Sequence, residues 1–186
     1  MNDAVQLILW LDKMHNVSRS VGLAHTFRLS KPSLKRHFAV YVVLAKGRRD
    51  TMLYVGKTGD NREGCNPLIS RCGNHFSYNS VHSQIRNKIK DHENREYVYC
   101  FDHFDSYQSG TKTDRVPIDR INEMERWLNQ EIQALVQGMT RCKLLNPYIG
   151  TSRLSETETE KRKMFRTRLA QNKIRGIVKA VCSELS

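Results

Sequence analysis

The sequence predicts an α+β domain in which a small three-stranded antiparallel sheet is flanked by helices, with helical extensions at both ends. Three stretches rich in aromatic and β-branched residues predict the strands, at 38–44, 51–56 and 96–104. Apolar residues recurring at helical spacing predict the helices between and after them. With 186 residues and 39% hydrophobic content, the chain can bury one modest core, so we expect one domain with extensions.

The N-terminal third contains the predicted hairpin. Residues 3–14 (DAVQLILWLDKM) predict a short helix with Asp3 as its N-cap, and the polar residues 15–36 predict a loop. The stretches FAVYVVL and TMLYVG are separated by the turn-prone AKGRRD. Two such runs joined by a short turn predict a pair of antiparallel strands.

The remaining elements alternate between helix and strand. A loop rich in glycine and asparagine at 57–66 is followed by Pro67, which suits the first turn of a helix. A second helix is expected at 80–92, before the third strand. The 3.6-residue periodicity predicts a long helix at 118–136 and a final amphipathic helix within the tail.

These elements divide the chain into three parts. We expect an N-terminal helix and basic loop at 1–37, a folded core at 38–150, and a C-terminal basic amphipathic helix at 151–186.

The charge distribution indicates a polyanionic partner. Lys and Arg number 31 against 19 Asp and Glu, a net charge of +12, and residues 13–49 contain no acidic residue. Such a one-signed surface is typical of nucleic-acid binding, although a basic surface can also serve only solubility. The basic residues expected to contact the nucleic-acid backbone are Lys35, Arg36, Arg48, Arg49 and Lys57.

Several other classes of protein are excluded by the sequence. The chain has no apolar run of about 18 residues and no signal-peptide layout, so we expect no membrane association and a cytoplasmic location. Five dispersed cysteines without a CxxC pair indicate neither a disulfide framework nor a zinc finger. The GKT string at 56–58 is no P-loop, because Thr51 stands where that motif needs glycine.

An ordered set of motif residues resembles the GIY-YIG nuclease domain over residues 38–148. The two signature tripeptides are Ala39-Val40-Tyr41 and Tyr54-Val55-Gly56, one on each predicted hairpin strand. Ala-Val replaces Gly-Ile in the first and Val replaces Ile in the second, so each position stays apolar. The remaining matches, in chain order, are Arg71, His75, Glu125 in EMERWL and Asn146 in LLNPY.

The resemblance implies phosphodiester hydrolysis with one Mg²⁺ or Mn²⁺ ion per active site, bound through Glu125. It further implies that Arg71 holds the phosphate and that Tyr41 activates or positions the attacking water. Tyr54 and His75 would assist, and Asn146 would brace the site by hydrogen bonding. Which of the two tyrosines or the histidine is the general base stays open.

Physical reasoning on the helix at 118–136 singles out Glu125 independently. Residues turn 100° apart around a helix, which places Glu125 inside the apolar stripe that contains Ile121 and Leu128. A carboxylate there is costly unless it is paired, protonated or bound to a metal. A salt bridge with an arginine is therefore the alternative to a metal site. Glu123 and Glu131 are expected to face solvent.

The other candidate residues also have ordinary interpretations. Arg71 and His75 are spaced i, i+4 on one helix face, where they could bind a phosphate or merely form a basic surface turn. Tyr41 and Tyr54 could be core aromatics, and a phenol near its usual pKa of about 10 would need neighbouring cations to act as a base.

The sequence therefore favours a metal-dependent DNA endonuclease, most similar to the restriction enzymes of this family. Such an enzyme cuts both strands of double-stranded DNA, so we expect assembly of identical subunits. A homing- or repair-type nicking nuclease is the nearer alternative, and a non-catalytic basic nucleic-acid-binding module is the more distant one.

Overall fold

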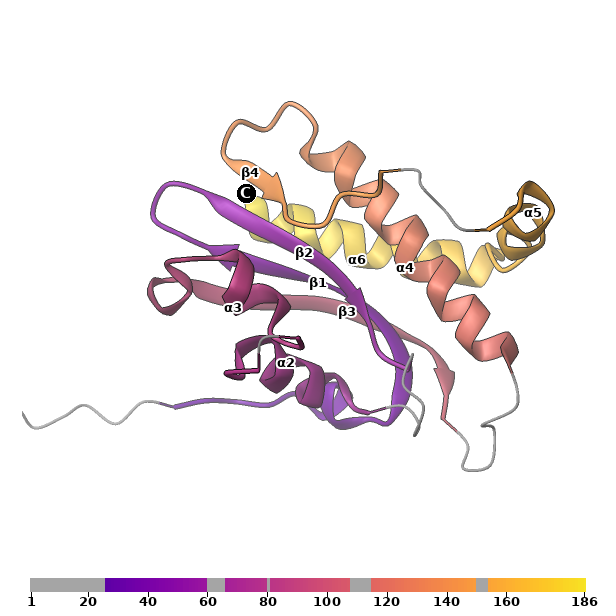
Figure 1. The fold of residues 1–186 in the computed structure, drawn as a ribbon, viewed down its shortest axis with the longest axis horizontal. Coiled ribbons are helices and arrows are strands. Elements are labelled where there is room, and N and C mark those ends of the chain that lie inside the picture. The colour runs from indigo at the N-terminus through magenta and orange to yellow at the C-terminus, as the bar shows by residue number, and fades with distance from the viewer. Residues whose placement is uncertain (1–25, 60–65, 80, 108–114, 150–153) are drawn as a thin grey trace, which may run out of the picture.

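The computed structural model describes residues 26–59, 66–79, 81–107, 115–149 and 154–186 (Figure 1). The helix predicted at 3–14 lies outside the described residues. The elements in chain order are η1 Lys31–Leu34, β1 His37–Lys46, β2 Thr51–Lys57, α2 Leu68–Phe76, α3 Gln84–Lys88, η2 His92–Asn94, β3 Glu96–Ser106, α4 Arg115–Val136, β4 Cys142–Leu144, α5 Glu156–Lys163 and α6 Arg168–Leu185.

The sheet is mixed and has four strands in the order β3-β1-β2-β4. Strand β1 pairs antiparallel with β2, as predicted for the hairpin, and also with β3, while β4 adds to the outer edge of β2 in parallel. The prediction of a three-stranded, wholly antiparallel sheet is therefore wrong. Strand β4 has only three residues, too few to show an alternating pattern, and it exists because β2 offers it unpaired backbone groups.

The central strand β1 separates two apolar clusters. Val40, Val42 and Leu44 face the larger cluster under α4 and α6. Tyr41 and Val43 face the smaller cluster under α2 and α3, so helices cover both faces (Figure 1). Burial on both faces explains why β1 reads as a continuous apolar run instead of an alternating one.

Helix α6 is part of the main core. Its buried residues Ala170, Ile174, Ile177 and Val181 belong to the larger cluster, beside α4. The predicted amphipathic tail helix is thus confirmed, with its apolar side on the sheet. Among the described helices, none combines the length and apolar content that crossing a membrane requires.

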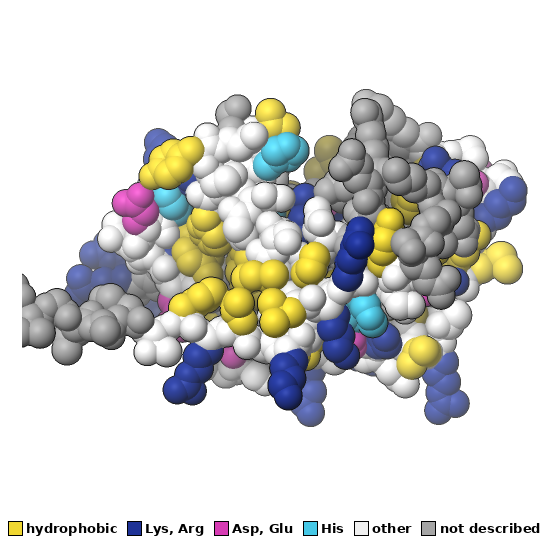
Figure 2. Space-filling model, turned by 90° about the horizontal axis from the view of Figure 1, so that it is seen from below, with side chains coloured by type: hydrophobic (Ala, Val, Ile, Leu, Met, Phe, Trp, Pro, Cys, Tyr) yellow, Lys and Arg dark blue, Asp and Glu magenta, His cyan; other side chains and the backbone are white. Residues whose placement is uncertain are grey.

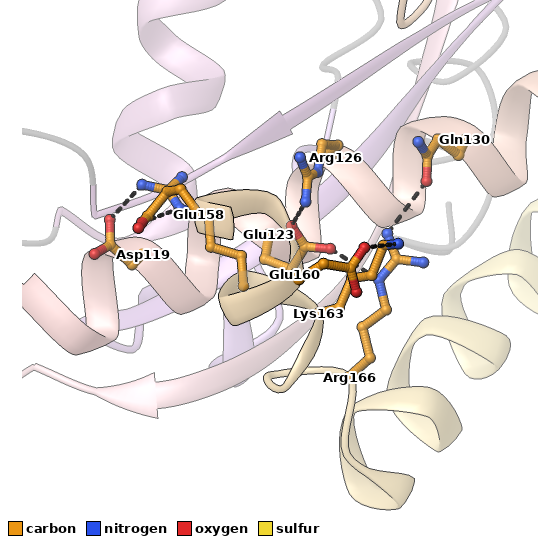
Figure 3. A network of polar contacts seen from close by, with 9 residues as sticks. Asp119, Glu123, Arg126, Gln130, Glu158, Glu160, Lys163 and Arg166 are labelled. Atoms are coloured by element: carbon orange, nitrogen blue, oxygen red, sulfur yellow. Dashed lines mark hydrogen bonds and ion pairs between the residues drawn. The ribbon is translucent and has the colours of Figure 1, made fainter. Parts of the chain in front are cut away.

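An ion-pair network ties the C-terminal segment to α4 (Figure 3). The Nε atom of Arg166 lies 2.8 Å from a carboxylate oxygen of Glu123, which also pairs with Arg126. Arg162 reaches Asp119 at 2.8 Å. The Glu123 side chain has no exposed surface, so the prediction that it faces solvent is wrong, because the segment joining α5 to α6 covers a second side of α4. Glu131 is exposed, as predicted.

The helix boundaries also differ from the prediction in two places. The helix expected at 80–92 is reduced to α3, Gln84–Lys88, followed by the 3₁₀ turn His92–Asn94. Helix α4 begins at Arg115, earlier than predicted. Helix α2 begins directly after Pro67, which stands at its N-cap.

Candidate active site

The two tripeptides meet at a single cross-strand pair. Tyr41 of β1 lies opposite Gly56 of β2, and paired residues of antiparallel strands face the same side. A Cβ atom on Gly56 would lie 2.5 Å from the Tyr41 hydroxyl oxygen, so a larger residue cannot occupy this position without moving the ring. The glycine therefore provides the space in which the Tyr41 hydroxyl sits.

Helix α2 brings a histidine and an arginine to that hydroxyl. The Tyr41 hydroxyl oxygen lies 2.8 Å from Nε2 of His75. The Tyr54 ring centroid is 5.1 Å from that of His75, and Arg71 also hydrogen-bonds Tyr41. His75 is only 1% exposed, so this pair is shielded from bulk water.

Burial determines the protonation states of the pair. It raises the pKa of Tyr41 far above its ordinary value, although the charge of Arg71 acts in the opposite direction. Burial, reinforced by Arg71, lowers the pKa of His75 to about 4. At neutral pH Tyr41 is a phenol and His75 is a neutral imidazole, which can accept the phenolic proton.

Glu125 enters from α4, on the other side of the sheet. Its Oε2 atom lies 2.5 Å from Nζ of Lys57, the residue after Gly56. The ion-pair alternative considered for Glu125 is thus realised with a lysine instead of an arginine. The Glu125 carboxylate raises the pKa of Tyr41, so the two groups are within electrostatic reach of each other.

Asn146 fixes the strand that presents Tyr54 and Gly56. Its side-chain oxygen accepts a hydrogen bond from the Val55 amide at 3.1 Å, and its side-chain nitrogen donates to the Val55 carbonyl at 2.8 Å. Asn129 of α4 in turn donates to the Asn146 carbonyl at 2.8 Å. Sequence reasoning missed Asn129, although it is a polar residue four positions after Glu125 on the same apolar stripe.

The basic residues expected to bind nucleic acid divide between the two ends of the hairpin. Lys35 and Arg36 are exposed directly before β1, and Lys57 ends β2, so these three lie at the Tyr41 end. Arg48 and Arg49 are exposed in the β1–β2 turn at the opposite end. At about 3.3 Å per residue, that turn is more than ~15 Å from Tyr41.

The donor set fits a metal ion only in an open coordination mode. No group of three or more His, Cys, Asp or Glu residues that could hold a metal occurs within the part of the chain that the structure describes. Mg²⁺ is commonly held by one or two carboxylates, with water and substrate phosphates as the other ligands. Glu125, whose side chain is 26% exposed, fits that mode as the single protein ligand.

Comparisons with known protein families, with curated proteins and with solved structures found no match. The functional interpretation therefore depends on the residues themselves and on their geometry.

Proposed function

We propose that the protein is a metal-dependent DNA endonuclease that hydrolyses phosphodiester bonds beside Tyr41. The observation that supports this most directly is the buried hydrogen bond between the Tyr41 hydroxyl and His75, with Arg71 beside it. A phenol, a neutral imidazole and a guanidinium together provide a proton path and an anion-binding group.

In this mechanism the water loses its proton through Tyr41. The attacking water donates a hydrogen bond to the Tyr41 oxygen, while Tyr41 donates its own proton to Nε2 of His75. As the water oxygen bonds to phosphorus, its proton moves to Tyr41 and the phenolic proton moves to His75. The bond from phosphorus to the leaving oxygen then breaks, and that oxygen leaves with the bonding electron pair and takes a proton from solvent water. Arg71 stabilises the charge that develops on the phosphate.

Glu125 supplies the metal-binding carboxylate. When bound, Mg²⁺ or Mn²⁺ would stabilise negative charge on the scissile phosphate and on the leaving oxygen. Lys57 compensates the Glu125 charge through their ion pair and is close enough to that carboxylate to contact the same phosphate. Asn146 positions Tyr54 and Gly56 through its two hydrogen bonds to Val55.

Within this class we favour a cytoplasmic restriction-type enzyme acting on double-stranded DNA. The net charge of +12 supports a nucleic-acid substrate. Cutting both strands with one site per chain requires two copies, which supports a homo-oligomer. A homing- or repair-type nicking enzyme would need only one.

Cleavage of supercoiled plasmid tests the proposal. Wild-type protein should cut in Mg²⁺ or Mn²⁺ and not in chelator, and Glu125→Gln should lose at least about 100-fold in rate while still binding DNA. Glu131→Gln, an exposed change on the same helix, should cut normally. Linear products would support a restriction-type enzyme and open circles a nicking one. Full activity of Glu125→Gln would reject the site, and binding without cleavage in either metal would leave only the binding module.

A further inference from the structure

A second cluster of cationic and imidazole groups lies beyond Tyr41, where β1 begins and β3 ends. Phe101 pairs with Tyr41 and His103 pairs with Ala39. The ring of His103 lies 5.5 Å from that of Phe101 and 5.1 Å from that of His37, measured between centroids. The His37 backbone is fixed by the hydroxyl of Thr58, which donates to the His37 carbonyl at 2.9 Å.

Positive charge surrounds the two histidines on several sides. Lys35 is exposed just before β1, and Lys173 of α6 donates to the His103 carbonyl. Arg36 packs over the ring of Tyr107, 4.3 Å from its centroid. Figure 2 shows Lys and Arg side chains beside a histidine on the face that carries α2.

Two acidic side chains lie near this cluster, and each has one carboxylate oxygen engaged. Asp102 accepts a hydrogen bond from the His103 amide at 2.7 Å, and Asp105 pairs with Arg120 of α4 at 2.5 Å. Burial lowers the pKa of His103, and His37, Lys35 and Lys173 lower it further, against the opposing effect of Asp102. Nε2 of His103 is buried and makes no hydrogen bond within the described residues.

We propose that Lys35, His37 and His103 form a second phosphate-binding site, which holds the DNA backbone next to the cleavage site and takes up a proton when the DNA binds. The inference rests on the proposed function for its ligand, because the same duplex would occupy both sites. A phosphate placed here favours the charged imidazole, which reverses the effect of the neighbouring cations. A protonated histidine then donates a charge-assisted hydrogen bond to the phosphate.

The spacing suits a single duplex. Ala39, opposite His103, and His37 stand two and four residues from Tyr41 along β1, which corresponds to about 7 and 13 Å at 3.3 Å per residue. One strand of B-DNA advances about 3.4 Å along the helix axis per nucleotide. A phosphate two to four nucleotides from the scissile one would therefore reach the cluster.

The test is the affinity for a fluorescent 30-base-pair duplex, measured by anisotropy in chelator between pH 8 and pH 6 and over a salt series. Wild-type affinity should rise several-fold as the pH falls, because a bound phosphate favours the charged form of an imidazole beside it, whereas the phosphodiester itself does not titrate in this range. His37→Gln should remove most of that rise. Lys35→Ala should reduce the slope of log affinity against log salt by about 0.9, the value for one phosphate contact. Lys179→Ala, an exposed change on α6, should alter neither quantity.

Two results would contradict the second phosphate-binding site. A wild-type affinity that does not change with pH, or a folded His37→Gln variant with an unaltered pH dependence, would overturn it. In wild-type protein, histidine ring proton shifts on adding the duplex give a readout that does not depend on any variant folding. Because the binding assay contains no free metal, pH-linked binding without cleavage would contradict only the nuclease proposal. If the wild-type protein cleaves DNA but the pH dependence of binding is unaltered in His37→Gln, only this inference is contradicted.

Discussion

The two faces of the sheet differ in what β1 buries on each side. On the α4–α6 face, Val40, Val42 and Leu44 contribute only apolar side chains to the larger cluster. On the α2 face, the same strand buries the Tyr41 hydroxyl against the His75 imidazole, and the partly buried Tyr99 packs against the smaller cluster. The side chains of β1 on one face are therefore wholly apolar, whereas those on the other face include a buried hydroxyl.

This difference supports the proposal, in which the α4–α6 face holds the fold together and the α2 face carries the proposed active site. Buried polar groups cost free energy unless they are hydrogen-bonded, so their concentration around Tyr41 and His75 suggests a role other than stability. Glu125 links the two faces, because it comes from the helix of the larger core and still influences Tyr41 electrostatically. Substitutions on the two faces should therefore affect activity and stability differently.

The largest effect is expected from Tyr41→Phe. This change removes the hydroxyl that, in the proposed mechanism, connects the attacking water to His75, while keeping the ring that packs under α2. We expect the cleavage rate to fall by about 10²- to 10⁴-fold, the usual contribution of general acid–base catalysis. The free energy of unfolding should fall by no more than about 2 kcal/mol, the cost of one lost buried hydrogen bond. Single-turnover plasmid cleavage and urea unfolding measure the two quantities.

Leu44→Ala on the same strand is the matched control for Tyr41→Phe. Leu44 is fully buried in the larger cluster, so its truncation should cost about 2–5 kcal/mol of stability. At a temperature where the variant remains folded, its cleavage rate should stay close to wild type. An equal loss of activity in both variants would mean that the two faces do not divide these roles.

A smaller effect is expected from Gly56→Ala. The added Cβ would meet the Tyr41 hydroxyl oxygen at 2.5 Å and force the ring to shift. A displacement of about 1 Å in a reacting group can cost on the order of 100-fold in rate, so cleavage should fall by that amount with the protein still folded. Gly176→Ala in α6, where the added Cβ meets nothing within 4 Å, should preserve activity and raise helix stability by up to about 1 kcal/mol. A fully active Gly56→Ala variant would contradict the placement of Tyr41.

The sequence predicted the elements whose pattern is local. Strand β1 was evident from FAVYVVL, and α4 and α6 were evident from their periodicity. In each of these elements, the pattern of apolar residues within the segment itself reflects which side chains are buried. Strand β4 was missed because a three-residue strand is defined only by its partner β2. Glu123 was placed in solvent because periodicity reveals one apolar stripe, whereas α4 is covered on two sides and its second contact is made by Arg126 and Arg166.

The candidate site was likewise predictable only where its features are local in the sequence. The spacing of Arg71 and His75 indicated a shared helix face. The position of Glu125 in an apolar stripe indicated a carboxylate whose burial costs free energy unless it is paired, protonated or bound to a metal. The identity of its partner, Lys57, was not predictable, since it depends on how α4 crosses the end of β2. The dominance of burial over Arg71 in setting the pKa of Tyr41 also depends on tertiary packing, which no local pattern contains.

The smallest effect, and the one that tests the α2 face without DNA, is the dependence of stability on pH. The pKa of His75 is about 4 in the folded protein and about 6.5 in an unfolded chain. Between these values the unfolded state binds a proton that the folded state does not. The stability linked to His75 is therefore fully present above the unfolded pKa of about 6.5 and is lost as the pH drops toward 4. By pH 5.5 the loss should be about 1 kcal/mol.

Replacing His75 by Gln should remove this part of the profile, whereas His82→Gln, at an exposed histidine, should leave it unchanged. Urea unfolding from pH 7.5 to 5 measures the profile, and the ring-proton titration of His75 in the wild-type protein checks it directly. A midpoint near 6.5 for that resonance would show that the imidazole is freely hydrated, and it could not then be the buried proton acceptor of Tyr41.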